Sequence, residues 1–162
     1  MTESVAIIGA GLTGLMCAAQ LAARGYRVSI FEQRSLKDIY HHQTNDLIGS
    51  SRSMSMDISA RGIYALKNIN VFDKVFSQSI PMKWRIMHDR LGRKTILPYG
   101  QYESENILTV SRHHLFQTLF DWCLKTNSID INFECKFVDF DSKKKLSLIK
   151  DAQNIIREHK SS

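Results

Sequence analysis

The chain has 162 residues, a formal net charge of +6 and 43% hydrophobic residues. About 100–200 residues make one ordinary domain, so this length indicates one domain or one lobe of a larger protein. The apolar content and the 23% of charged residues argue against wholesale disorder. No apolar run approaches the roughly 20 residues that a membrane-spanning helix needs.

The cysteines and the basic clusters exclude several classes of protein. Cys17, Cys123 and Cys135 show no C-x-x-C spacing, which disfavours a disulfide scaffold and a zinc site and makes a reduced cytoplasm the expected compartment. Basic residues gather at Arg90–Lys94 and at Lys143–Lys145, but no nucleic-acid motif accompanies them. We therefore expect small anionic molecules as partners, and neither nucleic acid nor a membrane.

The first thirty residues predict one βαβ unit. Val5–Ile8 is a β-branched apolar run that is typical of a buried parallel strand. Leu12–Arg24 is rich in helix-forming residues, and Gly25 follows where a C-cap glycine belongs. Cys17 is expected in the core face of this helix. Val28–Phe31 is a second apolar run, so the two strands should be parallel.

The remaining elements alternate between helices and strands. Leu36–Ser55 is polar and predicts a long loop. The elements expected next are a helix over Ala60–Ile69 capped by Ser59, a helical turn over Val71–Phe76, a hairpin of Trp84–Met87 and Thr95–Leu97 around Asp89–Gly92, and a strand over Ile107–Val110. After these we expect a helix capped by Ser111 and running to about Lys125, with an apolar stripe of Leu115, Phe116, Leu119, Phe120 and Cys123. The last elements expected are a strand over Ile129–Phe133, two strand fragments within Phe137–Leu148, and a fraying tail from Asp151.

The turn after the first strand carries a glycine motif. Gly9-Ala10-Gly11-Leu12-Thr13-Gly14 fits the pattern G-x-G-x-x-G. In this pattern Gly9 allows the tight turn, Gly11 lets a pyrophosphate approach the backbone, and Gly14 lets the helix pack close to the strand. The helix N-terminus offers unpaired N–H groups and a partial positive charge to phosphates. The motif therefore predicts a dinucleotide-binding site.

An acidic residue completes this motif. Glu32 ends the second strand, 18 residues beyond Gly14, close to the spacing of about 20 residues that dinucleotide sites show. A carboxylate at this place accepts hydrogen bonds from ribose hydroxyls and repels a 2′-phosphate, so NADP is a poor ligand for this site. The alternative is a structural turn followed by an exposed glutamate. The motif does not choose between FAD and NAD.

Further stretches show a resemblance to a known family. Arg52–Gly62 is similar to a conserved block of flavoprotein aromatic hydroxylases, and Ile80–His88, Ile96–Gly100 and Ile107–Arg112 narrow the match. Together these blocks resemble the kynurenine 3-monooxygenase family from about Ser4 to Asp141. The resemblance implies an FAD-dependent enzyme of tryptophan degradation. Such an enzyme uses NADPH and O2 to hydroxylate the ring of kynurenine through a flavin C4a-hydroperoxide.

The resemblance also implies roles for individual residues. Besides the glycines of the turn, the residues implied to contact FAD are Thr13, Glu32, Gln33, Arg34, Arg52, Asp57, Arg112 and Phe137. Among them Asp57 would approach the flavin, Arg112 the phosphates and Phe137 the adenine. Arg85 and Tyr99 match the residues that hold the amino-acid end of kynurenine, since a guanidinium forks onto a carboxylate and a phenol adds a neutral hydrogen bond.

The implied fold is of the α/β class. It is a Rossmann-like FAD-binding domain over residues 1–76 and 104–162, incomplete relative to the family, with the start of a substrate lobe over residues 77–103. Asp57 stands where the family has a small residue, and Ser55 where it has an asparagine. The later Gly-Asp motifs of the family are absent. We therefore expect little or no hydroxylase activity from this chain alone, and self-association or a completing chain.

The same residues allow two other functions and disfavour a metal site. A non-catalytic dinucleotide-binding module that needs a partner stays open. An NAD-dependent dehydrogenase also stays open, although the block Arg52–Gly62 argues against it. The pairs His41-His42 and His113-His114 point to no metal, because neighbouring histidines diverge and no acidic or cysteine ligands complete either site at the usual spacing.

Overall fold

The computed structural model describes residues 3–39, 55–102 and 105–160. The chain packs as two compact units, one made of residues 1–52 and 116–162 and the other of residues 53–115. The functional division expected above, residues 1–76 with 104–162 against 77–103, stays a prediction. The expected site residue Arg52 and the pair His41-His42 lie outside the described residues.

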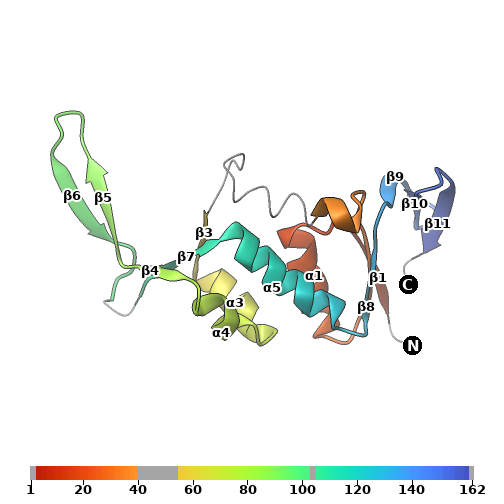
Figure 1. Cartoon of the computed structure of the whole chain (residues 1–162), viewed down its shortest axis with the longest axis horizontal. Coiled ribbons are helices and arrows are strands. Elements are labelled where there is room, and N and C mark those ends of the chain that lie inside the picture. The colour runs from red at the N-terminus through yellow and green to blue at the C-terminus, as the bar shows by residue number, and fades with distance from the viewer. Residues whose placement is uncertain (1–2, 40–54, 103–104, 161–162) are drawn as a thin grey trace. The chain divides into compact units, whose positions relative to one another are not determined.

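The first unit contains the predicted βαβ unit (Figure 1). Its parallel sheet has the order β1-β2-β8, formed by Ser4–Ile8, Arg27–Phe31 and Ile129–Asn132. Val5 pairs with Val28, and Val28 pairs with Ile129. Helix α1, Leu12–Ala22, joins β1 to β2 and ends before the expected Arg24; its C-cap residue is Ala23, and Gly25 lies in the turn beyond it with a φ of +91°. The predicted parallel pairing is confirmed, and the predicted glycine lies in the turn after the helix rather than at its C-cap.

Two expectations about burial in this unit are wrong. β2 is buried at Val28, Ile30 and Phe31, but β1 is only partly buried and Ile8 is 48% exposed, because β1 is an edge strand of the described sheet. Cys17 is exposed, since the buried face of α1 consists of Leu15, Ala18 and Ala19. A run of helix-forming residues does not reveal which face of the helix is covered.

Helix α5 contributes the predicted apolar stripe. It spans Arg112–Leu124, and the structure buries Leu115, Phe116, Leu119, Phe120 and Cys123. The rings of Phe116 and Phe120 stack with centroids 5.4 Å apart, and Phe120 meets the edge of Phe133 at 6.2 Å. Ser111 belongs to the preceding strand, which ends where the helix begins.

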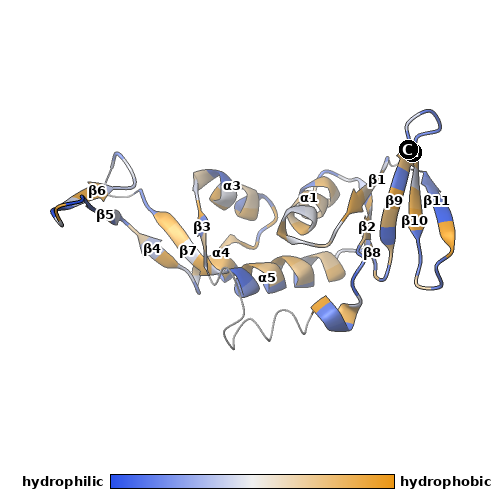
Figure 2. Ribbon diagram, turned by 90° about the horizontal axis from the view of Figure 1, so that it is seen from above, coloured by the Kyte–Doolittle hydropathy of each residue, from blue (hydrophilic) through white to orange (hydrophobic). Residues whose placement is uncertain are grey.

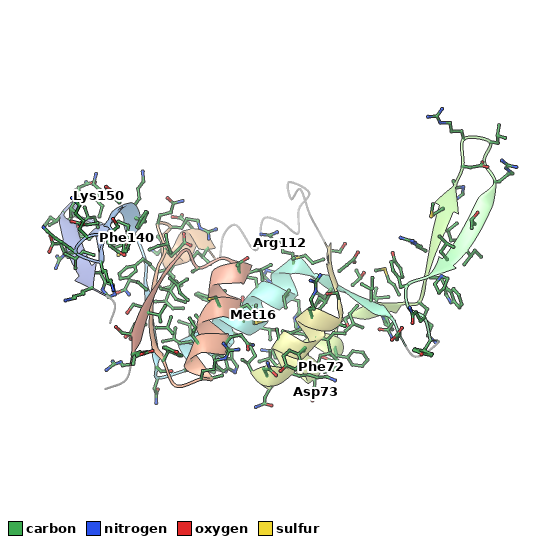
Figure 3. The ribbon with its side chains drawn as sticks, turned by 180° about the vertical axis from the view of Figure 1, so that it is seen from behind. Met16, Phe72, Asp73, Arg112, Phe140 and Lys150 are labelled. Atoms are coloured by element: carbon green, nitrogen blue, oxygen red, sulfur yellow. The ribbon has the colours of Figure 1, made fainter. Side chains whose placement is uncertain are left out.

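The C-terminal residues form a second sheet in the first unit. Its antiparallel order is β9-β10-β11, formed by Lys136–Asp141, Leu146–Lys150 and Ile156–Lys160. Phe140 and Lys150 mark β9 and β10 in Figure 3. The expectation of a fraying tail from Asp151 is wrong, because Asp151 organises the turn into β11: its carboxylate accepts the Ile155 N–H at 2.9 Å and pairs with Arg157 at 2.8 Å.

The second unit holds a small sheet and two helices. β7, Ile107–Ser111, lies between β3, Ser55–Ile58, and β4, Ile80–Met82, and pairs antiparallel with both. Helices α3 and α4 span Ala60–Asn68 and Phe72–Phe76. Among the described residues of this unit, the buried apolar side chains are Ile58, Leu66, Ile69, Val71, Val75, Leu108, Val110 and Leu115. Ser59 is the N-cap residue of α3, but its side chain makes no cap hydrogen bond.

A separate hairpin completes the second unit (Figures 1 and 2). β5, Trp84–His88, pairs antiparallel with β6, Lys94–Pro98. Asp89 closes the turn, because its carboxylate accepts the N–H groups of Leu91 at 2.8 Å and Arg93 at 2.9 Å. The predicted hairpin is confirmed.

The predicted long loop lies mostly outside the described residues. Where the structure describes it, residues 36–39 are helical and Ser55 already belongs to β3, so the loop is shorter than expected at both ends. No helix in the described part of the chain is long and apolar enough to cross a membrane.

Candidate functional site: the glycine turn and Glu32

The turn from β1 into α1 needs glycine at two positions. Gly9 has a φ of +96°, a conformation that residues with a Cβ rarely adopt, and its N–H donates to the Phe31 carbonyl at 2.8 Å. A Cβ on Gly14 would collide with the carbonyl oxygen of Gly9. These two glycines therefore keep the helix close to the strand, as the spacing predicts.

Gly11 leaves space beside the backbone. A Cβ at this position would have no described atom within 4 Å, and Gly11 itself has an ordinary φ of −80°. Gly11 is the N-cap residue of α1, and no described side chain caps the helix. The first turn of α1, which includes the exposed Thr13, thus presents backbone N–H groups and the positive end of the helix dipole to this space.

Glu32 is a buried carboxylate beside this turn. Glu32 is only 3% exposed. Oε2 accepts the backbone N–H of Ala10 at 2.8 Å, which connects the end of β2 to the glycine turn. Oε1 accepts the backbone N–H of Arg34 at 3.0 Å. The Arg34 guanidinium forks onto both oxygens, from Nε to Oε1 at 2.9 Å and from Nη2 to Oε2 at 3.2 Å.

These partners keep Glu32 ionised. Burial alone would raise the pKa of its carboxyl, because it disfavours the charged form. The hydrogen bonds from Arg34 and Ala10 and the positive charge of Arg34 outweigh burial and lower the pKa from 4.5 to about 2. The carboxylate is therefore charged at every pH near neutrality.

A cavity of about 210 Å³ opens beside Glu32. Residues from the ends of β1 and β2 and from the start of β9 line it: Ile8, Gly9, Phe31, Glu32, Gln33, Cys135, Lys136 and Phe137. Backbone hydrogen bonds hold these segments together, since Glu32 donates to the Asn132 carbonyl at 2.9 Å and accepts from the Cys135 N–H at 2.9 Å. The carboxyl ends of parallel strands are where open α/β sheets bind ligands.

The structure brings together the expected site residues that belong to the first unit. Gly9, Glu32, Gln33 and Phe137 line one cavity. Gly11, Thr13 and Gly14 lie in the same turn. Arg34 holds Glu32 rather than pointing into open space. Cys135 and Lys136 line the same cavity and were not predicted; their position directly before Phe137 is the signal that could have found them.

The other expected site residues belong to the second unit. Asp57 is exposed on β3 opposite Thr109, whose hydroxyl donates to Asp57 Oδ1 at 2.6 Å and also contacts the Met82 sulfur at 3.0 Å. Arg112 is exposed and begins α5 directly after β7 (Figure 3). Asp57 thus has a hydrogen-bond donor of its own within the sheet.

Arg85 lies on β5 of the hairpin, and Tyr99 directly follows β6. Arg85 is paired with Leu97, and the Tyr99 N–H donates to the Lys83 carbonyl at 3.0 Å, which continues the same register. Tyr99 thus follows the last strand pair, Trp84 with Pro98, and lies at the same end of the hairpin as Arg85. Tyr99 also lines a cavity of about 600 Å³ in this unit, together with residues of α3, α4 and β7.

Within residues 3–39, 55–102 and 105–160, no group of three or more His, Cys, Asp or Glu side chains is arranged to hold a metal ion. His114 instead contacts the Lys74 carbonyl through Nε2 at 3.1 Å.

Comparison with known proteins identifies relatives of this chain. The family described as "NAD(P)-binding Rossmann-like domain" matches residues 7–36. The chain is 35% identical to kynurenine 3-monooxygenase of Legionella pneumophila (strain Corby), over 86% of this chain and 30% of the relative. It is 36% identical to the Sus scrofa enzyme, over 80% of this chain and 26% of the relative, and 36% identical to the Saccharomyces cerevisiae enzyme, over 85% and 29%. The resemblance to kynurenine 3-monooxygenases is confirmed, and the chain spans about 30% of the length of these relatives.

Solved structures share the fold. p-Nitrophenol 4-monooxygenase PnpA from Pseudomonas putida DLL-E4 matches with a TM-score of 0.72 and 15% identity, over 98% of this chain and 38% of that protein. The flavin-dependent monooxygenase PieE, solved with FAD and substrate, matches with a TM-score of 0.71 and 16% identity, over 100% of this chain and 29% of that protein. The Rossmann-like α/β fold is confirmed. The shared fold extends beyond Asp141, where the sequence resemblance was expected to end.

Proposed function

We propose that this chain binds the ADP half of FAD and forms the dinucleotide-binding part of an FAD-dependent aromatic hydroxylase of the kynurenine 3-monooxygenase type. The observation that carries the proposal is the buried, ionised Glu32, hydrogen-bonded to Ala10 of the glycine turn at 2.8 Å and facing a cavity. An ionised carboxylate accepts hydrogen bonds from the two hydroxyls of a ribose.

The residues present fit the ADP half of FAD. The open side of Gly11 admits a pyrophosphate close to the backbone. The uncapped first turn of α1, including the backbone at Thr13, supplies N–H donors to the phosphates. Gln33 and Phe137 line the same cavity as Glu32, where the adenine side of the nucleotide would lie. The adenosine ribose of FAD carries no 2′-phosphate, a group that the negative charge of Glu32 would repel.

The roles of the remaining site residues are part of the proposal. Arg112 would bind the cofactor's phosphate region, Asp57 would approach the flavin, and Arg52 would be a further contact to FAD. Bound flavin, reduced by NADPH, would supply the oxygen-activating chemistry for hydroxylation of an aromatic ring. Arg85 and Tyr99 would hold the carboxylate of a kynurenine-like amino acid; both lie at the same end of the hairpin, and a guanidinium forks onto a carboxylate.

We also propose that the 162-residue chain has little or no hydroxylase activity by itself. Oxygen-activating flavin chemistry needs a site closed to water, and strand β5, which carries Arg85, is exposed along its whole length. A non-catalytic dinucleotide-binding module, completed by a partner chain, is the alternative. Formation of 3-hydroxykynurenine by the purified chain with NADPH would overturn the inactive assignment.

Gel filtration with excess FAD or FMN tests the proposal. FMN has the flavin but no ADP half, so it is a matched control ligand. We expect flavin absorbance under the folded-protein peak with FAD and none with FMN. A folded peak without flavin would contradict the proposal. Better protection against heat denaturation by NADH than by FAD would favour a dehydrogenase instead.

A further inference from the structure

The hydrogen-bonding capacity of the Glu32 carboxylate is already used. An ionised carboxylate offers about four acceptor positions, two on each oxygen. In this structure Oε1 accepts the N–H and the Nε–H of Arg34, and Oε2 accepts the Ala10 N–H and an Nη2–H of Arg34. A ribose can therefore bond to Glu32 only where one of these donors leaves.

Only the Arg34 side chain is free to leave. The backbone donors are fixed by the fold: Ala10 belongs to the glycine turn, and the Arg34 carbonyl accepts the Glu134 N–H at 3.2 Å. The Arg34 side chain is 39% exposed, so its guanidinium can move into water at little cost in solvation. An arginine fork and a vicinal diol both approach a carboxylate with two parallel donors, one to each oxygen.

We infer that the Arg34 side chain is a displaceable latch, which occupies in the free chain the acceptor positions of Glu32 that the ribose hydroxyls take when a nucleotide binds. This inference rests on the proposed function, because it assumes that Glu32 is the ribose acceptor. Binding exchanges two guanidinium hydrogen bonds for two ribose O–H hydrogen bonds. The latch thus opposes nucleotide binding and keeps the buried carboxylate paired while the site is free.

Removal of the latch should strengthen the contribution of the ribose hydroxyls. Arg34→Met keeps most of the apolar stem and removes the fork, and Arg34→Lys keeps the charge but cannot bond to both oxygens with a planar fork. Arg24→Met is the matched control, because Arg24 is exposed in the turn between α1 and β2. The control should behave as the wild type.

The test compares ADP with 2′,3′-dideoxy-ADP by calorimetry. The dissociation constant of 2′,3′-dideoxy-ADP divided by that of ADP isolates the contribution of the ribose hydroxyls. The attraction of Arg34 for the phosphates is the same for both ligands and cancels in this ratio. We expect this ratio to be about three- to tenfold larger in Arg34→Met than in the wild type, the range of one to two modest hydrogen bonds, and intermediate in Arg34→Lys. An equal or smaller ratio in Arg34→Met would overturn the latch.

A spectroscopic measurement gives a second readout that needs no activity. In the free wild type the Arg34 Nε–H is bonded to Glu32, so its NMR signal should be protected from exchange with water. ADP should abolish this protection, and persistence of protection at saturating ADP would overturn the latch. Failure of the folded wild type to bind either ADP or FAD would instead overturn the proposed function, and the latch with it.

Discussion

The backbone N–H of Ala10 donates to the Glu32 carboxylate at 2.8 Å across 22 residues of sequence. This hydrogen bond connects the loop that would hold the phosphates to the acid that would hold the ribose. Since β1 and β2 are parallel neighbours, the turn that follows β1 and the residue that follows β2 meet at the carboxyl ends of the strands. The geometry of the site is thus a consequence of the fold.

Two glycines of the turn should respond differently to the same substitution. Gly14→Ala places a Cβ against the Gly9 carbonyl, and overpacking of this kind costs about 1–3 kcal/mol of unfolding free energy. Gly11→Ala enters open space and should change stability by less than about 0.5 kcal/mol, but it should weaken FAD binding. Urea unfolding and FAD titration of both variants check this, and equal stability losses would contradict the assignment.

Stability should fall in acid because of Glu32. Its pKa is about 2 in the folded chain against an ordinary value of 4.5, so the folded state binds fewer protons than the unfolded state between these values. The stabilisation is complete above about pH 4.5 and is lost as the pH falls towards 2, with a size on the order of 3 kcal/mol.

Urea unfolding of the wild type and of Glu32→Gln across this range measures the effect. The Gln variant should be less stable at neutral pH and should show a shallower decline in acid. Glu134→Gln is the control, because Glu134 is exposed. Parallel pH profiles for the wild type and Glu32→Gln would show that Glu32 is not the group responsible.

The three cysteines should react with N-ethylmaleimide in a fixed order. Cys17 is exposed. Cys123 is fully buried, its thiol contacts the Leu15 carbonyl at 3.5 Å, and burial raises its pKa to about 12. Because the thiolate is the reactive form, Cys17 should be alkylated first and Cys123 last. Mass spectrometry of timed samples tests this order, and early labelling of Cys123 would mean that the α5 core opens readily.

The hairpin should promote self-association. Ile86 and Ile96 are directly opposed on β5 and β6 and are 59% and 63% exposed, and Trp84 on the same face is 56% exposed. Exposed apolar patches favour association. The double variant Ile86→Thr/Ile96→Thr retains β-forming residues and should sediment as a smaller species than the wild type. Lys94→Thr serves as the control. Unchanged sedimentation of the double variant would show that this face is not the surface through which the chain associates.

The sequence was most informative where local rules determine the structure. The spacing of Gly9, Gly11 and Gly14 predicted the turn, because backbone conformation and close approach permit few residues at such positions. The stripe from Leu115 to Cys123 predicted the buried face of α5, since helical periodicity places these residues together.

The sequence was less informative where distant pairing decides the structure. β11 was missed because Ile156–Lys160 is polar and exposed apart from partial burial at His159, and only its pairing with β10 makes it a strand. The partial burial of β1 depends on its place at the edge of the sheet. The Arg34 fork was also not predicted, because residue spacing does not reveal which of several possible partners an exposed arginine takes.

Titration of FAD into the 162-residue chain and its Glu32→Gln and Glu134→Gln variants, followed by flavin fluorescence, tests the central claim most directly. The account predicts saturable binding at one FAD per chain to the wild type and to Glu134→Gln, and clearly weaker binding to the folded Glu32→Gln variant. Equal binding to all three proteins, or none to the folded wild type, would contradict the assignment of this turn and carboxylate as the nucleotide site.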